Sequence, residues 1–134
     1  MNLTPLEIQS MQSRSYEHPK DVVFPSVMSV FQDLGYSINS ADMVTGLITA
    51  ESTAASDKAM KFWLGITKVT QTKANAFIEE ISGQTKVRIN FITTNKKSDW
   101  YGQTDREDNQ ILTPEPYQNA FEKIENAVFI RSSS

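Results

Sequence analysis

The sequence predicts an α+β domain in which an antiparallel sheet of four to five strands is packed on one face by two main helices. Residues 21–34 and 114–128 carry apolar side chains at helical spacing. Several short segments between them alternate apolar and polar residues, which is typical of strands with one buried face. The chain of 134 residues has a usual length for one domain, and we expect that single α+β domain over 14–131.

The chain is expected to begin with a segment outside this domain. Residues 1–13 are polar with scattered apolar side chains and no clear period, so we expect an arm or a tether. A short strand is predicted at 14–17. His18 and Pro19 end it, because proline biases the preceding residue toward extended backbone.

The helix expected at 21–34 is the most clearly marked element. Its apolar residues recur at i, i+4, i+7, i+8 and i+11, and they are Val23, Val27, Val30, Phe31 and Leu34. Asp21 is a good N-cap residue, and Pro25 is expected within the first turn, where a missing N–H costs little. Gly35 suits the left-handed residue that follows a helix end.

Two hairpins are predicted. Residues 36–39 and 46–50 are expected to pair across a polar turn, and 72–81 to pair with 85–94 across the turn at 82–84. In the last of these strands, buried and exposed positions alternate: Val87, Ile89 and Phe91 on one side, Arg88 and Asn90 on the other. This alternation predicts a sheet with one face toward the core and one toward water.

The segments between these elements are less regular. We expect a loop over 52–56 and a helical turn over 57–64. Residues 95–112 are polar and too numerous for a tight turn, so they predict a long connection.

The final helix is expected to begin at Thr113 and Pro114, because proline is favoured at the first helical position. Its apolar stripe consists of Tyr117, Ala120, Phe121, Ile124 and Val128. We expect Phe129 and Ile130 to pack as the chain leaves the helix.

The residue inventory disfavours catalysis. The chain has no cysteine, which excludes disulfides, thiolate nucleophiles and thiolate metal sites. His18 is the single histidine, and we interpret it as a solvated junction residue, since no nucleophile pattern lies near it. Asp105, Glu107 and Asp108 lack the spacing of a calcium loop, and the glycines form no phosphate-binding cluster. We expect no enzymatic activity, no cofactor and no metal.

Charge and hydropathy limit the partners. The net charge of −3 comes without a basic face, so we expect no nucleic-acid binding. No apolar run approaches the roughly 20 residues that span a bilayer, and the first residues show no signal-peptide pattern.

Three aromatic residues are candidates for partner binding: Trp63, Trp100 and Tyr101. Trp100 and Tyr101 fall in the polar segment 95–112, and aromatic side chains on loops often anchor a partner. The alternative is that these aromatic residues fold back as a lid over the sheet edge or the core.

Several stretches carry a family resemblance: QSRSYE at 12–17, FQDLGY at 31–36, GLITA at 46–50, KVRINF at 86–91, and Pro116, Tyr117, Gln118, Phe121, Lys123, Ile124, Phe129 and Ile130 near the end. Together they resemble a family of small proteobacterial lipoproteins of uncharacterised function. The resemblance spans roughly residues 12–131, and its motifs are structural.

The resemblance implies a helix-grip-like domain, similar in shape to domains of lipoproteins that assist outer-membrane protein assembly. It implies a non-enzymatic binding or scaffolding module at the periplasmic face of the cell envelope, with envelope proteins as partners. Such proteins are attached to the membrane through a lipidated cysteine. Because this chain has no cysteine, we expect that the export signal and that cysteine were removed, leaving 1–13 as the remaining tether. An alternative function is a carrier of a small apolar ligand in a cavity between sheet and helix.

Overall fold

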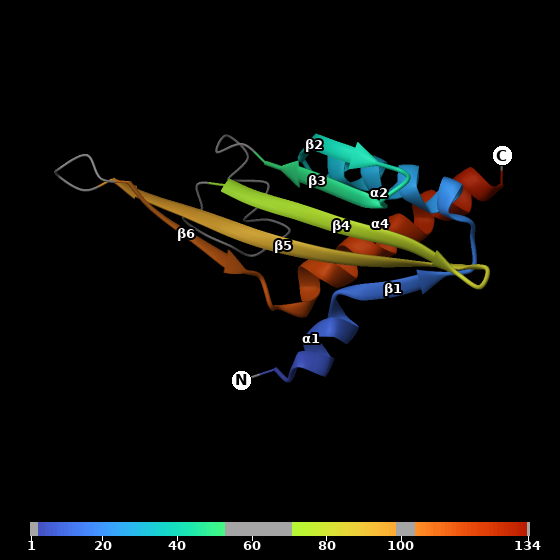
Figure 1. The fold of residues 1–134 in the computed structure, drawn as a ribbon, viewed down its shortest axis with the longest axis horizontal. Coiled ribbons are helices and arrows are strands. Elements are labelled where there is room, and N and C mark those ends of the chain that lie inside the picture. The colour runs from blue at the N-terminus through green and yellow to red at the C-terminus, as the bar shows by residue number, and fades with distance from the viewer. Residues whose placement is uncertain (1–2, 53–70, 99–103, 134) are drawn as a thin grey trace.

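The computed structural model describes residues 3–52, 71–98 and 104–133. These residues form one six-stranded antiparallel sheet and three helices (Figure 1). In chain order the elements are α1 (Pro5–Met11), β1 (Ser13–Tyr16), α2 (Lys20–Asp33), β2 (Ser37–Asp42), β3 (Leu47–Glu51), β4 (Gln71–Ile81), β5 (Gln84–Ser98), β6 (Thr104–Gln110) and α4 (Pro114–Ser132). The α+β class predicted from the sequence is confirmed.

The two predicted helices cover one face of the sheet. Figure 1 shows α2 behind β2 and β3, and α4 running behind β4 and β5. The predicted stripe of α4 is buried, and so are the central apolar residues of α2. Burial of these stripes against the sheet supplies the main stabilisation of the fold, because burial of apolar surface is the dominant favourable term in folding.

The start of α2 differs from the prediction. Pro19 is the N-cap, and Glu80 Oε1 accepts a hydrogen bond from the Lys20 N–H (2.9 Å), whereas Asp21 lies inside the first turn. Pro25 is consequently the sixth residue of the helix, beyond the first turn. A distant strand residue therefore supplies the acceptor that sequence reasoning assigned to a local side chain.

The end of α2 follows the prediction. Gly35 has a φ of 96°, in the left-handed region. The Gly35 N–H donates to Gln32 O (3.1 Å) and the Tyr36 N–H donates to Phe31 O (3.0 Å), which is the hydrogen-bond pattern of a Schellman motif. The rings of Phe31 and Tyr36 pack with centroids 6.0 Å apart. This turn directs the chain into β2.

Both predicted hairpins are present, but the turn predicted at 82–84 is one residue shorter, because Gln84 already pairs with Ile81. The register of the hairpins positions the two faces of the sheet. The turn between β4 and β5 has two residues, Ser82 and Gly83, both with positive φ (52° and 82°). Such a type I′ turn fixes the register of a hairpin. Ala74, Ala76 and Ile78 thereby oppose the predicted core residues of β5, and all of these side chains are buried.

The prediction of a long connection at 95–112 is wrong. β5 continues to Ser98, and β6 pairs with it from Ile92↔Gln110 to Ser98↔Thr104, adding a sixth strand to the four or five expected. β6 contains no apolar residue, so its sequence lacks the alternation that marks a half-buried strand.

Two terminal segments also differ from expectation. Within 1–13, expected to be an arm or a tether, Pro5–Met11 forms the helix α1, and the following Gln12 is buried at 3% exposure. At the other end α4 continues to Ser132, and Phe129 and Ile130 are exposed instead of packed.

Candidate functional site

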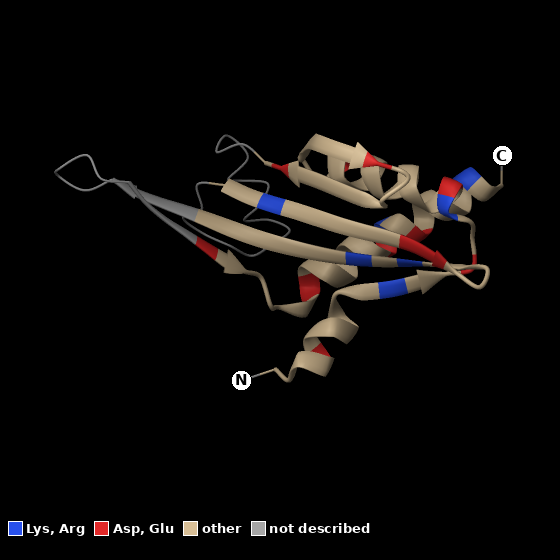
Figure 2. Cartoon of the chain, in the orientation of Figure 1, with Lys and Arg blue, Asp and Glu red and all other residues tan. Residues whose placement is uncertain are grey.

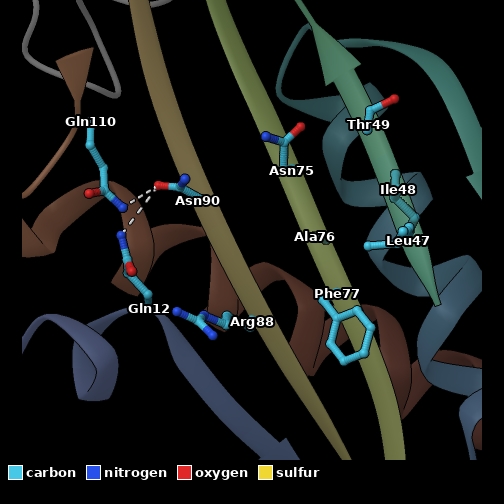
Figure 3. Close-up of a pocket in the computed structure, with 10 residues that line it drawn as sticks. All are labelled: Gln12, Leu47, Ile48, Thr49, Asn75, Ala76, Phe77, Arg88, Asn90 and Gln110. Atoms are coloured by element: carbon cyan, nitrogen blue, oxygen red, sulfur yellow. Dashed lines mark hydrogen bonds between the residues drawn. The ribbon is translucent and has the colours of Figure 1, made fainter. Parts of the chain in front are cut away.

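The face of the sheet opposite α2 and α4, here called the open face, is not covered by any helix among the described residues (Figure 1). It carries a groove of about 460 Å³ that crosses β3, β4 and β5 (Figure 3). The sheet register arranges the groove's side chains in two parallel rows.

The first row joins apolar surface to a cation. Leu47 on β3 lies opposite Phe77 on β4, and Phe77 lies opposite Arg88 on β5. Leu47 is 50% exposed and Phe77 is 39% exposed. Directly opposite side chains in an antiparallel pair have Cβ atoms roughly 5 Å apart. The row therefore forms one continuous strip across three strands.

The second row is polar. Thr49 lies opposite Asn75, and Asn75 lies opposite Asn90. Asn90 Oδ1 accepts hydrogen bonds from Nε2 of Gln110 (2.7 Å) and of Gln12 (3.4 Å), as Figure 3 shows. We call Gln12, Asn90 and Gln110 the carboxamide cluster. Its members come from three separate segments of the chain.

The hydroxyl of Tyr117 holds this cluster at a break in the sheet. Along one edge of β5, residues 85–88 pair with β1 and residues 92–98 pair with β6, which leaves a gap at 89–91. At the two ends of this gap the Ile89 N–H donates to Gln12 O and the Ile111 N–H donates to Phe91 O (both 2.8 Å). Between them the Tyr117 hydroxyl accepts from the Phe91 N–H and from Gln12 Nε2 (both 3.2 Å), and it donates to Ile111 O (2.6 Å). Its burial raises the pKa of the Tyr117 phenol.

On the open face, two lysines of β4 and β5 lie opposite carboxylates, whereas Arg88 does not. Lys73 lies opposite Glu51, and Lys86 lies opposite Glu79. Arg88 lies opposite Phe77 on one side and Ser13 on the other. Figure 2 shows acidic and basic residues interspersed along the described elements, so Arg88 is a local positive feature and not part of a basic face.

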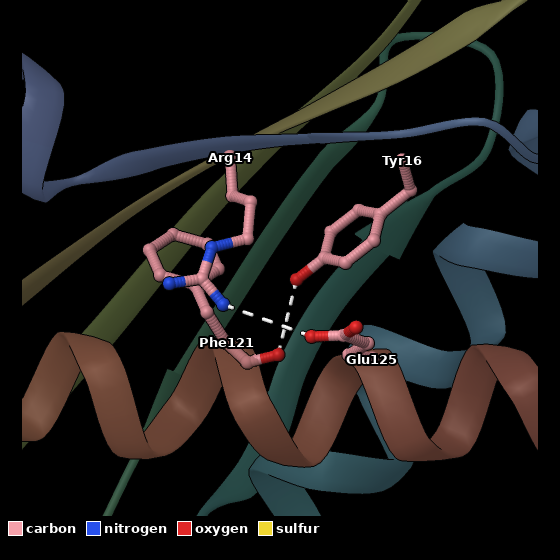
Figure 4. Close-up of polar contacts among 4 residues, drawn as sticks. All are labelled: Arg14, Tyr16, Phe121 and Glu125. Atoms are coloured by element: carbon pink, nitrogen blue, oxygen red, sulfur yellow. Dashed lines mark hydrogen bonds and ion pairs between the residues drawn. The ribbon is translucent and has the colours of Figure 1, made fainter.

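A second group of polar contacts lies where β1 meets α4 (Figure 4). The Arg14 guanidinium stands over the Phe121 ring, 5.1 Å from its centroid, and its Nη1 is 4.0 Å from Glu125 Oε2. The Tyr16 hydroxyl donates to Phe121 O (3.1 Å). Burial raises the pKa of Tyr16. We interpret this group as an attachment of the edge strand to the helix.

The aromatic residues predicted to bind a partner, Trp63, Trp100 and Tyr101, lie outside the described residues and stay predictions. His18 is half-buried, and its backbone carbonyl accepts a hydrogen bond from Thr85 Oγ1 (2.6 Å). Within the described residues, no group of three or more His, Cys, Asp or Glu side chains is placed to hold a metal ion.

Sequence reasoning missed most of the groove. It identified the outward positions of Arg88 and Asn90 from the strand alternation, but it gave no role to Gln12, Asn75 or Gln110. These residues meet only through the pairing of β1, β4 and β6 with β5. The predicted turn at 82–84 would place Asn75 opposite Phe91, and only the observed two-residue turn brings Asn75 opposite Asn90.

The groove offers hydrogen bonds, one positive charge and apolar surface, which suits recognition of a ligand. Among the described helices, none has the length and hydrophobicity that a membrane crossing requires. No protein-family model matches the chain. A search of curated proteins likewise finds no match.

Proposed function

We propose that this chain is a non-enzymatic binding or scaffolding module and that the open face of its sheet is the binding surface. The observation that carries the proposal is the exposure of Leu47 and Phe77, 50% and 39%, beside the carboxamide cluster. Exposed apolar residues that adjoin polar groups mark binding sites more often than plain surface.

The lining of the groove supports recognition over catalysis. Among the described lining residues, Arg88 is the only ionisable side chain. General acid–base catalysis most often uses histidine or a carboxylate, and the groove presents neither within that set.

The family resemblance supports a proposal for the cellular location of this module. We propose that the native protein is held at the periplasmic face of the cell envelope by a lipidated cysteine and that its partners are envelope proteins. Membrane fractionation and measurement of the intact mass of the native protein test this location. A diacyl or triacyl mass increment in the membrane fraction is expected, and an unmodified protein in the aqueous fraction contradicts it.

The alternative function, a carrier with a ligand between sheet and helices, finds less support in the described core. Aromatic rings occupy this space: the Phe91 ring lies 5.1 Å from that of Tyr117, 6.2 Å from that of Tyr36 and 6.4 Å from that of Phe31, measured between centroids. Native mass spectrometry of the purified protein tests the alternative, because a carrier would retain a bound lipid or metabolite.

A pull-down from envelope extracts tests the proposed surface. In the double variant Leu47→Thr/Phe77→Thr, we expect recovery of envelope partners to fall at least about tenfold, since the apolar strip is lost while threonine suits a strand. Phe129→Gln/Ile130→Gln is the matched control, because these apolar residues are exposed to an even greater degree but lie on α4. Undiminished recovery with the groove variant would reject the open face as the surface.

The same experiment separates the two candidate surfaces. Trp100→Ala/Tyr101→Ala removes the aromatic residues that the sequence identifies as anchors. If only this variant loses the partners, binding takes place through the segment around Trp100. If only the Leu47/Phe77 variant loses them, it takes place through the groove.

A further inference from the structure

Arg88 is the feature of the groove that indicates what it binds. The side chain is exposed on β5, and it is the only ionisable side chain among the described lining residues. Lys73 and Lys86, on the same face, lie opposite carboxylates, whereas the cross-strand neighbours of Arg88 are Phe77 and Ser13. Glu79, diagonal to Arg88, lies opposite Lys86. A guanidinium whose directly opposite neighbours are neutral favours an anionic ligand, and its fork of donors fits a carboxylate.

The carboxamide cluster adds to this preference for an acceptor. Asn90 lies two residues from Arg88, on the same face of β5. Its Oδ1 is engaged by Gln110 and Gln12, so the group it can present to a ligand is the Nδ2 donor. A ligand oxygen between Arg88 and Asn90 would meet donors from both residues. Ionised carboxylates accept hydrogen bonds and donate none, which matches such a pair.

The apolar end of the same row indicates the chemistry of the remaining part of the ligand. Phe77 and Leu47 continue from Arg88 across two strand spacings, about 10 Å in total. Apolar surface at one end and a cation at the other correspond to a molecule with an apolar body and a terminal carboxylate. A neutral polar ligand would leave Leu47 and Phe77 without contacts, and a polyanion would meet only one cation.

We propose that the groove binds a small amphipathic carboxylate, with its carboxylate on Arg88 and Asn90 and its apolar body on Phe77 and Leu47. This inference rests on the proposed function, because it assumes that the open face is a binding surface. A fatty acid and the C-terminus of an apolar peptide share this chemistry. No bond is made or broken in the binding step.

Titrations followed by amide NMR shifts test the proposal with four probes in two matched pairs. Octanoate is compared with octanamide, and N-acetylphenylalanine with its amide. We expect the carboxylates to shift the resonances of Leu47, Phe77, Arg88 and Asn90, and to bind roughly fivefold more tightly than the amides, the size expected of an exposed ion pair. The carboxylate that binds more tightly shows whether the natural ligand is lipid-like or peptide-like.

Variants separate the charge from the apolar contact. Arg88→Gln is expected to remove the preference for carboxylate over amide while leaving amide binding unchanged. Lys86→Gln is the matched control, because Lys86 lies on the same face of β5 opposite Glu79, and it should leave the preference intact. Leu47→Thr should weaken both members of each pair alike. Equal affinity of acid and amide for the unchanged protein, or no shift with either carboxylate at millimolar concentration, would overturn the proposal.

The test distinguishes failure of this inference from failure of the proposed function. Envelope partners lost in the Leu47→Thr/Phe77→Thr pull-down, without carboxylate binding, would leave the open face as a docking surface and reject the ligand. Carboxylate binding with undiminished recovery would keep the ligand site and reject the docking role.

Discussion

Tyr117 shows how a single hydroxyl group can complete a sheet. Sequence periodicity correctly placed its ring in the apolar stripe of α4. The periodicity could not indicate that the hydroxyl reaches the edge of β5, where it stands between the last residues paired with β1 and the first paired with β6. One donated and two accepted hydrogen bonds use the full capacity of a phenol.

Removing this hydroxyl should cost a large part of the stability of the domain. Tyr117→Phe leaves the Phe91 N–H and Ile111 O without their hydroxyl partner in a buried site, so we expect a loss of about 2–4 kcal/mol in the free energy of unfolding. Urea denaturation measures it. Tyr16→Phe is the control, because its hydroxyl makes one hydrogen bond, to Phe121 O, and should cost about 1 kcal/mol. Similar losses in the free energy of unfolding for both variants would show that the additional hydrogen bonds of Tyr117 do not stabilise the domain.

Only some of the residues that line the groove could be predicted from the sequence. Alternation in β5 correctly indicated which side chains face outward, so Arg88 and Asn90 were accessible to sequence reasoning. Gln12 was assigned to an arm and Gln110 to a loop, because neither is flanked by a periodic pattern. Their positions depend on backbone pairing with a distant strand.

At the scale of elements, strands with a buried face were predictable and β6 was not. The alternation of apolar and polar residues predicts β5, whereas in β4 the apolar residues Phe77 and Ile81 lie on the exposed face together with Glu79. β6 has the sequence TDREDNQ, which is polar throughout, and it forms because β1 pairs only with residues 85–88 of β5 and leaves the rest of that edge to β6. Backbone hydrogen bonding to a neighbour can thus extend a sheet where side-chain pattern gives no signal.

Gly46 permits the β2–β3 hairpin to lie against β4. Its φ is 82°, its carbonyl accepts from the Ile78 N–H (2.8 Å), and a Cβ at this position would collide with Ile78 O. We expect Gly46→Ala to lower the free energy of unfolding by at least about 3 kcal/mol, since backbone strain and a clash with a strand add together.

Gly83 provides a matched control for this substitution. It has the same φ of 82°, but a Cβ there would meet nothing within 4 Å. Gly83→Ala should therefore cost only the strain of the left-handed backbone, about 1–2 kcal/mol. Thermal or urea unfolding compares the two variants, and equal losses would exclude the contact with β4 as the reason for glycine at position 46.

At the scale of the whole molecule, three buried tyrosines and the candidate site lie on different sides of the sheet. Tyr16, Tyr36 and Tyr117 are buried with the core under α2 and α4, while the groove lies on the open face. The apolar periodicities alone predicted this division into a helix-covered face and a polar face. They could not predict the function, because the groove's chemistry depends on side chains from separate strands.

The buried tyrosines predict a stability that decreases in alkaline solution. Burial raises the pKa of Tyr16, Tyr36 and Tyr117 above the value of about 10 that is ordinary for a tyrosine. Below about pH 10 the phenols are protonated in both states, and the free energy of unfolding does not depend on them. Above about pH 10 the unfolded chain releases phenol protons that the folded chain retains, so stability falls, by up to about 1.4 kcal/mol per pH unit for each tyrosine.

Two measurements test this dependence together. Urea unfolding between about pH 9 and pH 11 should show stability that is level at first and then declines, and Tyr36→Phe should decline less steeply, because one of the three groups is removed. The ultraviolet absorbance of tyrosinate should show that at least three of the four tyrosines stay protonated until the circular dichroism signal is lost. If all four ionise while the chain is folded, the core under α2 and α4 admits water, and the phenols do not couple protonation to folding.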